Sequence, residues 1–291
     1  MNKKFSALLL AGLMTLSLAA CGGSDPAPAS SGGSAAGTDA AGEKTPLSQL
    51  LYAVEEGSAG MAAAEENSFD YNAVTAQSDA LMEVAAGTSD AAIIDLLMAG
   101  AMIGEGTSYP NLVYTAELTT EEYGVGCRKG SDLAAFINGV FAASYADGSM
   151  LELANTYGVQ ESIVAQSAPG DYAPTTDGDV AYIQGKGTLV VGITDFAPMD
   201  YKDENGNWIG FDADMAKKVA QELGVEVQFV EINWDNKILE LENKSIDVVW
   251  NGMTLTDEVK NAMECTNAYC NNAQVVVIPA EKADVYADAL A

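Results

Sequence analysis

Hydrophobic and polar positions follow two alternating patterns from about residue 49 onward. Short apolar runs typical of strands cover 49–54, 71–74, 91–94, 112–115, 123–128, 189–193, 225–232, 247–250 and 273–279. Between them, apolar residues recur every three or four positions, which is typical of helices, at 58–67, 78–87, 96–103, 133–145, 150–157, 212–224, 236–243 and just after 256. Strands that alternate with helices predict an α/β fold whose sheets are largely parallel and covered on both faces.

Several of these segments contain residues that typically begin or end a helix. Ser58, Asp212 and Thr256 stand where an N-cap side chain is expected, and Gly87 and Gly224 stand where helices end. The segment 166–187 differs from its surroundings because it is polar and rich in Gly, Asp and Pro. We interpret it as a linker.

The first 46 residues carry no folding pattern. Residues 1–21 have the form of a secretion signal, with Lys3 and Lys4 before an apolar run, and Leu-Ala-Ala-Cys at 18–21 resembles a bacterial lipobox. The run is too short for a confident membrane span. Lipidation at Cys21 predicts a protein tethered outside the cytoplasmic membrane; an ordinary cleaved signal is the alternative. Residues 22–46 are mostly Gly, Ser, Ala, Pro and Thr and predict a flexible tether.

Composition narrows the range of functions. The formal net charge is −29, which disfavours binding to nucleic acid or to anionic lipid surfaces. The chain has no His, which removes the commonest general base and metal ligand, and Arg128 is its only Arg. We expect neither a metal site nor a cofactor.

Three cysteines follow Cys21. Cys127 lies in an apolar alternating run and is predicted to be a small core residue. Cys265 and Cys270 form a C-x4-C pair, which outside the cytoplasm is compatible with a local disulfide. Two buried thiols are the alternative, and the sequence does not decide between them.

Five segments resemble the extracellular solute-binding proteins of family 3, which supply polar amino acids to ABC importers. They are LVVGITDFAPMDYKDENGNWIGFDADMAKKVAQELG from Leu189, DVVWNGMTLTDEV from Asp247, AVEEGSAGMAAAEEN from Ala53, SDAAIIDLLMAG from Ser89 and EYGVGCRKGSDL from Glu122. In that family the segment similar to 189–279 begins the mature protein, whereas here it ends the chain. The order of the segments therefore predicts a circular permutation.

The resemblance implies a two-lobed fold like that of type II periplasmic binding proteins, with a ligand cleft between the lobes. The permutation predicts lobe 2 at 47–118 and lobe 1 at 119–280, the latter including the linker 166–187. The tail 281–291 is then expected to be a hinge strand. Ligands of open α/β sheets bind beyond the carboxyl ends of the strands, so the expected site lies there.

The resemblance also assigns site residues. The loop with Ser58, Ala59 and Gly60 is expected to hold a ligand carboxylate at a helix N-terminus, although helix capping explains Ser58 equally well. Asp95 is expected to accept a hydrogen bond from a ligand ammonium group, with helix capping as the alternative. The remaining expected contacts are stacking by Phe196 and Trp234, of which Phe196 can also be a core residue, and polar contacts from Asn251, Gly252 and Thr254.

Further acids lie near the expected cleft, and a basic residue is missing from it. Glu55, Asp195 and Asp200 can read a ligand side chain or can belong to the solvated surface. Val259 occupies the position at which the family carries the Arg that grips the ligand carboxylate. We therefore expect recognition to depend on the positive end of the ligand.

These expectations combine into one functional hypothesis. The chain is predicted to be a substrate-binding lipoprotein that captures an amino acid or a related amine for an ABC transporter permease. Its expected place is the outer face of the cytoplasmic membrane, and it is expected not to be an enzyme. An enzyme of dehydratase type on the same scaffold and a ligand-sensing accessory domain are the alternatives.

Overall fold

The computed structural model describes residues 44–167, 172–173 and 175–288. The predicted signal with Cys21, and the predicted tether up to residue 43, lie outside these residues. Within the described ranges, no helix combines the length and the apolar character that crossing a membrane requires. The described chain forms two main sheets, each covered by helices, and the predicted α/β architecture with two lobes is confirmed.

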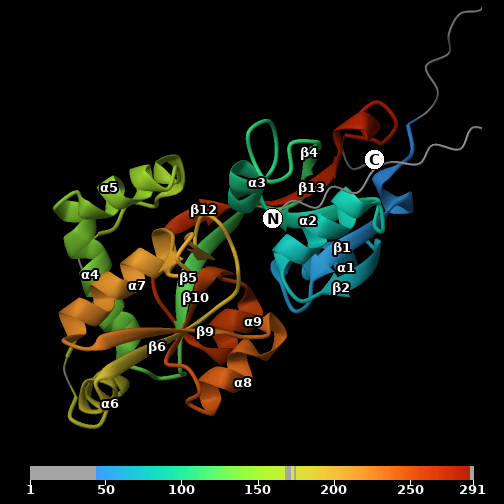
Figure 1. The fold of residues 1–291 in the computed structure, drawn as a ribbon. Helices are drawn as coiled ribbons and strands as arrows, with labels where there is room; N and C mark the ends of the chain where they lie inside the picture. Colours follow the sequence, from blue (N-terminus) through green and yellow to red (C-terminus); the bar gives the residue numbers. More distant parts are fainter. Residues whose placement is uncertain (1–43, 168–171, 174, 289–291) are drawn as a thin grey trace, which may run out of the picture. The chain divides into compact units, whose positions relative to one another are not determined.

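The sheet of lobe 2 has the strand order β2-β1-β3-β13-β4. Strand β1 pairs in parallel with β2 and β3, whereas β13 pairs antiparallel with β3 and β4, so the sheet is mixed. In Figure 1 the red strand β13 lies beside the green strand β4, although their sequences are far apart. The elements of lobe 2 are β1 (Leu51–Glu55), α1 (Ala59–Glu66), β2 (Asp70–Val74), α2 (Gln77–Ala86), β3 (Ala91–Asp95), α3 (Leu96–Met102), β4 (Leu112–Glu117) and β13 (Gln274–Pro279), with short 3-10 turns at Leu47–Gln49 and Ala280–Lys282.

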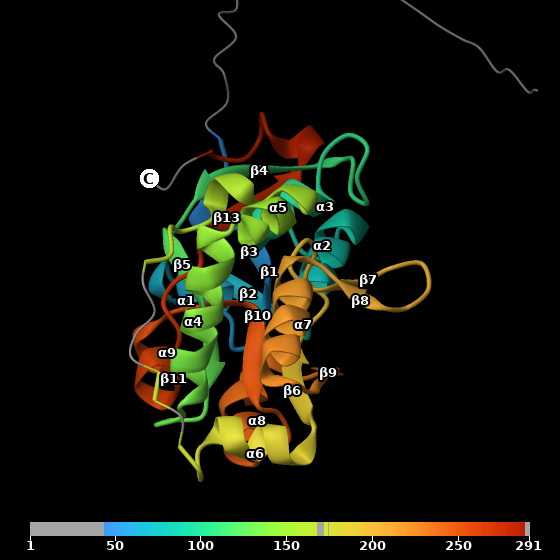
Figure 2. The same ribbon diagram turned by 90° about the vertical axis from the view of Figure 1, so that its left-hand side faces the viewer.

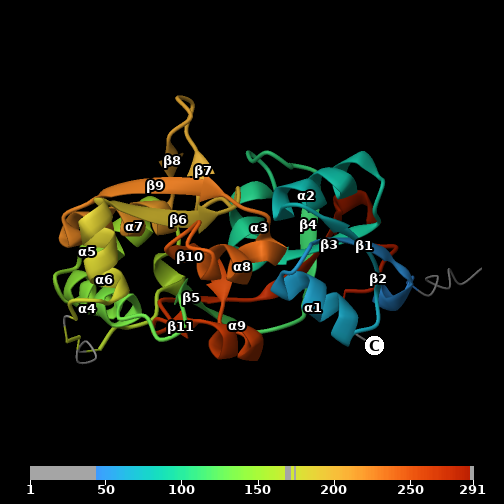
Figure 3. The same ribbon diagram turned by 90° about the horizontal axis from the view of Figure 1, so that it is seen from below.

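The sheet of lobe 1 has the strand order β11-β5-β10-β6-β9, and β12 pairs with β5 beside β11. Strand β6 lies between β10 and β9 and is parallel to both, which confirms that 189–193 lies in the same sheet as 247–250. Helices α4 and α7 lie side by side against this sheet (Figure 2), and α8 and α9 lie near β10 and β11 (Figure 3). The elements are β5 (Glu121–Cys127), α4 (Leu133–Ala146), α5 (Ser149–Thr156), α6 (Asp179–Lys186), β6 (Thr188–Ile193), β7 (Tyr201–Lys202), β8 (Trp208–Ile209), α7 (Phe211–Leu223), β9 (Glu226–Glu231), α8 (Lys237–Glu242), β10 (Val248–Thr254), α9 (Asp257–Ala262), β11 (Glu264–Cys265) and β12 (Cys270–Asn272), with 3-10 turns at Gln160–Ser162 and Trp234–Asn236.

Strand periodicity explains how each sheet is buried on both faces. In β10, Val248 and Trp250 join one apolar cluster, while Val249 joins another on the opposite face. In β13, Val275 and Val277 likewise face away from Val276 and Ile278. Because successive side chains of a strand point to opposite faces, such continuous apolar runs fit only strands with packed layers on both sides.

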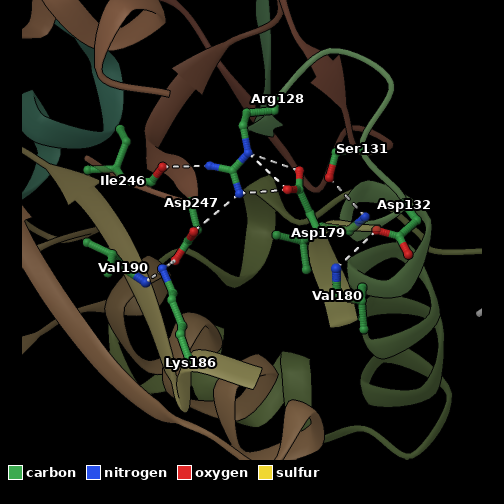
Figure 4. Close-up of polar contacts among 10 residues, drawn as sticks. Arg128, Ser131, Asp132, Asp179, Val180, Lys186, Val190, Ile246 and Asp247 are labelled. Carbon is green, nitrogen blue, oxygen red and sulfur yellow. Dashed lines mark hydrogen bonds and ion pairs between the residues drawn. The ribbon is translucent and has the colours of Figure 1, made fainter. Parts of the chain in front are cut away.

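The predicted linker 166–187 is wrong in its second half, because it contains helix α6. Arg128, directly after β5, donates to both carboxylate oxygens of Asp179, to Ile246 O and to Asp247 Oδ1 (Figure 4). Lys186 at the end of α6 forms a 2.5 Å ion pair with the same Asp247. Polar residues thus hold α6 to the sheet, and its few apolar positions explain why the sequence pattern missed it.

The predicted lobe boundary at 280 and the predicted hinge strand are also wrong. Strand β13 belongs to the sheet of lobe 2, so the chain crosses between the lobes at 118–120 and again at Ala273. The tail does not cross between the lobes: in its described part, Ala287 N donates to Thr45 O. The reason is that Val275, Val276, Val277 and Ile278 are all fully buried, which only a central strand position between β3 and β4 allows.

Several local predictions can be compared directly with the structure. Ser58 and Thr256 cap α1 and α9 through their side chains, and Gly87 and Gly224 end α2 and α7 in the left-handed conformation, as predicted. Asp212 is not a cap: α7 begins one residue earlier, and the Asp212 carboxylate points into the core.

The thiols of Cys127, Cys265 and Cys270 are free, so the disulfide alternative is wrong. Cys265 pairs with Gly126 of β5, whereas Cys270 pairs with Tyr123, three residues away. An odd separation directs the two side chains to opposite faces of the sheet, which prevents a bond. Cys127 is fully buried, as predicted.

Candidate functional site

A cavity of about 300 Å³ is lined by residues of both lobes. This volume is at the lower end of the range for small-molecule sites. Lobe 2 contributes the ends of β1 and β3 and the start of α1, and lobe 1 contributes the end of β10, the start of α9 and the turn before α8. The lining residues are Glu55, Gly57, Ser58, Ala59, Ala62, Gln77, Asp95, Trp234, Lys237, Asn251, Gly252, Met253, Thr254, Thr256, Asp257, Glu258 and Val259.

Most of the predicted site residues therefore line the same cavity. Glu55, Ser58, Ala59, Asp95, Trp234, Asn251, Gly252 and Thr254 all line this cavity. They come from strand ends and helix starts because parallel neighbours in a sheet place their carboxyl ends at the same edge. Whether each of them contacts a ligand stays a prediction.

Asp95 is the centre of a dense hydrogen-bond network at the end of β3. Its Oδ1 accepts from Tyr123 Oη, Asn272 Nδ2 and Gln274 Nε2, and its Oδ2 accepts from Gln77 Nε2. Asp95 does not cap α3 through its side chain, so the helix-cap alternative is wrong.

This network joins the two crossings between the lobes. Asn272 and Gln274 also donate to Glu121 Oε2, and both amides therefore bridge two carboxylates. Burial first, and then the neighbouring Glu121, raise the pKa of Asp95 to about 7. The network thus holds the Asp95 side chain in place at the cavity. It also links the Asp95 carboxyl group to both segments that cross between the lobes.

Glu55 ends β1 on the same side of the cavity. Its side chain is 3 % exposed, and Oε1 has no hydrogen-bond partner. Burial and the nearby Asp95 raise the pKa of Glu55 to about 8, while Lys237 opposes the shift. Glu55 is therefore a buried acid whose Oε1 can still accept a hydrogen bond. It does not belong to the solvated surface.

The start of α1 is arranged as predicted only in part. Ser58 Oγ accepts from Met61 N at 3.1 Å, so the hydroxyl oxygen serves as a helix cap, and Ala59 lines the cavity. Gly60 is not among the lining residues, and a Cβ at this position would be 2.9 Å from Ile93 O. Gly60 thus lets α1 approach β3 closely, and the predicted contact of its backbone N–H with a ligand stays a prediction.

Lys237 is a site residue that the sequence interpretation missed. Its Nζ donates to Gly57 O at 2.9 Å and to Trp234 O at 3.2 Å, and it lies 5.1 Å from the centre of the Trp234 ring. Burial lowers the pKa of Lys237. Its place three residues after Trp234, at a helix start, is the signal that could have revealed it. The bond to Gly57 joins lobe 1 to lobe 2.

The segment after β10 is committed partly to internal bonds. Asn251 exchanges hydrogen bonds with Thr194, and Gly252 N donates to Asp212 Oδ2 at 2.7 Å. Thr254 Oγ1 donates to Glu121 Oε2 at 3.0 Å, which leaves its lone pairs for a donor in the cavity. The Gly252 N–H is thus engaged inside the protein, and the predicted contact of the Gly252 backbone with a ligand stays a prediction for its carbonyl oxygen.

Two predicted residues lie away from the cavity. Phe196 is 2 % exposed and packs edge-on against Tyr123, directly behind Gly252, so its core alternative is confirmed. Asp195 lines a different depression together with Lys202, Trp208 and Glu231. Reciprocal backbone hydrogen bonds between Phe196 and Asp200 close a tight turn in this segment.

A second pair of buried acids lies under the site. Asp200 and Asp212 are both fully buried, and neither oxygen of Asp200 has a partner. Asp212 Oδ2 accepts from Tyr269 Oη at 2.6 Å in addition to Gly252 N, and burial raises its pKa to about 7. Burial and the neighbouring Asp212 hold the pKa of Asp200 well above its usual range. Asp200 therefore reads no ligand here. Within the described ranges, no group of three or more acids or thiols is arranged to hold a metal ion.

Comparison with known proteins supports the resemblance. Residues 189–286 match the model of the bacterial extracellular solute-binding proteins, family 3. The chain is 34 % identical over 98 residues to a probable histidine-binding protein of Neisseria gonorrhoeae. The aligned segment covers 34 % of this chain and 37 % of that protein. It is 33 % identical over 88 residues to the L-cystine-binding protein TcyJ of Escherichia coli K12, covering 30 % of this chain and 33 % of that protein.

Among solved structures, an ancestral cationic amino acid solute-binding protein is 46 % identical over a segment covering 28 % of this chain and 36 % of that one, with a TM-score of 0.28. The chain thus spans about a third of the length of the curated relatives it matches. The predicted resemblance to family 3 is confirmed for the segment 189–286. The circular permutation stays a prediction.

Proposed function

We propose that the protein binds an amino acid or a related small amine in the cavity between its lobes and passes it to an ABC transporter permease. The observation that carries the proposal is the composition of the cavity. Asp95 and Glu55 from lobe 2 oppose Trp234 and Lys237 from lobe 1 in a volume suited to a small polar solute. The similarity of 189–286 to the solute-binding family supports the same conclusion.

The arrangement assigns a role to each end of such a ligand. Oδ2 of Asp95 accepts a hydrogen bond only from Gln77 and can accept another from a ligand ammonium group. The start of α1 at Ala59 offers backbone N–H groups and a favourable dipole to a carboxylate. Trp234 supplies an aromatic face for the ligand side chain.

Binding, rather than catalysis, is the simpler account of these groups. The relatives that match the chain have names that describe binding of histidine and cystine. A dehydratase-type enzyme would have to use Glu55 or Asp95 as its acid or base. We infer that both acids serve recognition, since four side chains donate hydrogen bonds to Asp95 and hold its carboxyl group in place as an acceptor.

We also propose a lipid-anchored protein at the outer face of the cytoplasmic membrane, on the Leu-Ala-Ala-Cys motif at 18–21. The circular permutation belongs to the same proposal. It is supported by the order of the family-like segments along the chain.

A ligand screen tests the proposed function. The purified chain from residue 22 onward is heated with single amino acids, amines and short peptides, and each shift in melting temperature is followed by calorimetry. At least one amino acid or amine is expected to bind with a Kd in the micromolar range or below. The absence of any such ligand at millimolar concentration, together with turnover of a candidate substrate, would replace the proposal with the enzyme alternative.

A further inference from the structure

Glu55 is a carboxylate that the protein buries and leaves without a partner at one oxygen. It lines the cavity, is 3 % exposed, and its Oε1 makes no hydrogen bond. Burial of a charged or polar oxygen without compensation is costly, so a group of this kind indicates a missing partner. The proposed function uses Asp95 for the ligand ammonium group and does not account for Glu55.

The groups around Glu55 supply a partner only in part: a side-chain hydrogen bond from Gln77 and the charge of Lys237 favour its ionised form, yet Oε1 has no partner. The titratable and polar residues that act on Glu55 are Asp95 on β3, Gln77 and Asp79 on α2, and Lys237 at the start of α8. The exposed Asp257 and Glu258 at the start of α9 line the same cavity. Lys237 is the one cation in the lining, and its two assigned hydrogen bonds go to the carbonyl oxygens of Gly57 and Trp234.

The lining contains more acidic than basic groups. Four acids line the cavity against one lysine. A zwitterionic amino acid brings one positive and one negative charge, so it does not change this balance. A ligand with a second cationic group offsets this excess of acids and offers the carboxyl group of Glu55 a donor.

We propose that Glu55 binds a second cationic group of the ligand, and that the ligand class is therefore the basic amino acids or the diamines. This inference rests on the proposed function and deepens it. Asp95 then holds one cationic group and Glu55 the other. The two acids end adjacent parallel strands, β1 and β3, which places both at the same edge of the sheet.

Proton exchange is a consequence of this arrangement. Burial and Asp95 raise the pKa of Glu55 to about 8, and burial and Glu121 raise that of Asp95 to about 7, so near neutral pH the empty site carries protons on these groups. A cationic ligand favours the ionised acids and displaces the protons. Affinity is therefore expected to increase with pH below the pKa of the empty site, by up to about tenfold per pH unit for each proton released.

Calorimetry with matched ligands tests the inference. The pairs are L-arginine and L-citrulline, L-lysine and L-norleucine, and cadaverine and pentylamine, each differing in one cationic group. The wild-type protein is compared with Glu55→Gln, which keeps the size of the side chain and removes its charge. Glu56→Gln is the control, because Glu56 is the exposed neighbour and lies outside the cavity lining.

At least one basic probe is expected to bind the wild type tenfold or more tightly than its neutral partner. Glu55→Gln is expected to weaken binding of that basic probe about tenfold to a hundredfold, as for a lost charged hydrogen bond, and to change binding of the neutral partner far less. Glu56→Gln is expected to match the wild type. Titrations in buffers of different ionisation enthalpy are expected to show proton release that Glu55→Gln reduces.

Two results overturn the inference while the proposed function stands. One is a neutral amino acid that binds the wild type as tightly as its basic partner. The other is an equal loss for both members of a pair in Glu55→Gln. The comparison of ligand pairs and the proton release need only the wild-type protein, so a folding defect of the variant does not remove the test. If none of the probes and none of the screened solutes binds at all, the proposed function itself fails.

Discussion

At the scale of single residues, Asp95 and Trp234 are the proposed ligand contacts, and they line the cavity from different lobes. Asp95 is the last residue of β3, and Trp234 begins the 3-10 turn that follows β9. Val259 also lines the cavity, where it packs in the apolar cluster that contains Trp234 and Met253. Because position 259 carries Val in place of the family's Arg, this part of the cavity wall is apolar. Lys237 is the cation in the lining.

Asp95→Asn is expected to weaken binding of the ligand found in the screen. The amide keeps the size of the side chain but removes the charge, which corresponds to about 1.5–3 kcal/mol for a bond to an ammonium group. Trp234→Ala is expected to weaken binding as well through the lost aromatic face. Calorimetry measures both, and Asp70→Asn, an exposed acid on β2, is the control. Unchanged affinity in both variants with an intact fold would place the site elsewhere.

At the scale of elements, the contact between the β1–α1 loop and the turn before α8 connects the lobes. Gly57 has φ = 70°, and a Cβ there would lie 2.7 Å from Asp235 Cα. The loop therefore needs a glycine for its backbone conformation and for the close approach of lobe 1. Lys237 strengthens the same contact through Gly57 O.

Gly57→Ala is expected to lower ligand affinity more than it lowers stability. The new methyl group keeps the lobes apart, because its neighbour is backbone that cannot rotate away. Gly87→Ala is the matched control, since Gly87 has φ = 74° but no atom within 4 Å of the place that a methyl group would take. Both variants are expected to lose about 1 kcal/mol of unfolding free energy through the left-handed conformation. Equal affinities in calorimetry would show that the contact does not affect binding.

The polar network that holds α6 gives a second prediction at this scale. Arg128→Met leaves Asp247, which is fully buried, with one positive partner fewer, and is expected to lower the free energy of unfolding by about 3–5 kcal/mol. Lys202→Met is the control, because its ion pair with Glu231 is exposed and is expected to contribute about 1 kcal/mol or less. Urea unfolding measures both. Similar losses would mean that the network is not what fastens α6.

At the scale of the whole molecule, buried acids make stability depend on pH. Asp212, with a pKa of about 7 in the folded protein, holds a proton that the unfolded chain releases near its ordinary pKa of 3.8. The folded state thus binds more protons between these values, so stability is expected to be full below about pH 4 and to fall as pH rises toward about 7.

Asp212→Asn is expected to flatten this decline, because the amide carries no charge at any pH and its oxygen can still accept from Gly252 N. Urea unfolding without ligand near pH 5 and near pH 8 measures the difference, which is expected to be smaller in the variant by about 1 kcal/mol or more. Glu222→Gln, at an exposed position of α7, is the control. A variant with the same pH dependence as the wild type would assign the decline to other acids, such as Glu55 and Asp95.

The anchoring of the whole molecule is predicted from its first 21 residues. The wild type is expected to partition into the detergent phase and to carry a lipid mass on Cys21, whereas Cys21→Ala is expected to remain in the aqueous phase. Mass spectrometry of the mature N-terminus provides the measurement. A wild-type protein that is freely secreted without modification would contradict the prediction.

The sequence by itself determined the α/β class, most strands and helices, and the residues at the strand ends that form the cavity. These follow from periodicity, from caps such as Ser58 and Thr256, and from glycines that end helices, all of which act over a few residues. The resemblance to a family added the two lobes and the expected roles of Asp95 and Trp234. These features can be predicted from the sequence because each depends only on residues that are neighbours in the chain.

Only the tertiary structure decided which sheet received β13, how α6 is held, and that Phe196 faces the core. Each depends on partners distant in sequence: β3 and β4 for β13, Arg128 for α6, and Gly252 for Phe196. The roles of Lys237 and Glu55 also depend on tertiary packing. Lys237 donates a hydrogen bond to the carbonyl oxygen of Gly57, and Oε1 of Glu55 has no hydrogen-bond partner. Burial and hydrogen bonding between distant segments are properties of the packed chain, so no pattern within a single segment specifies them.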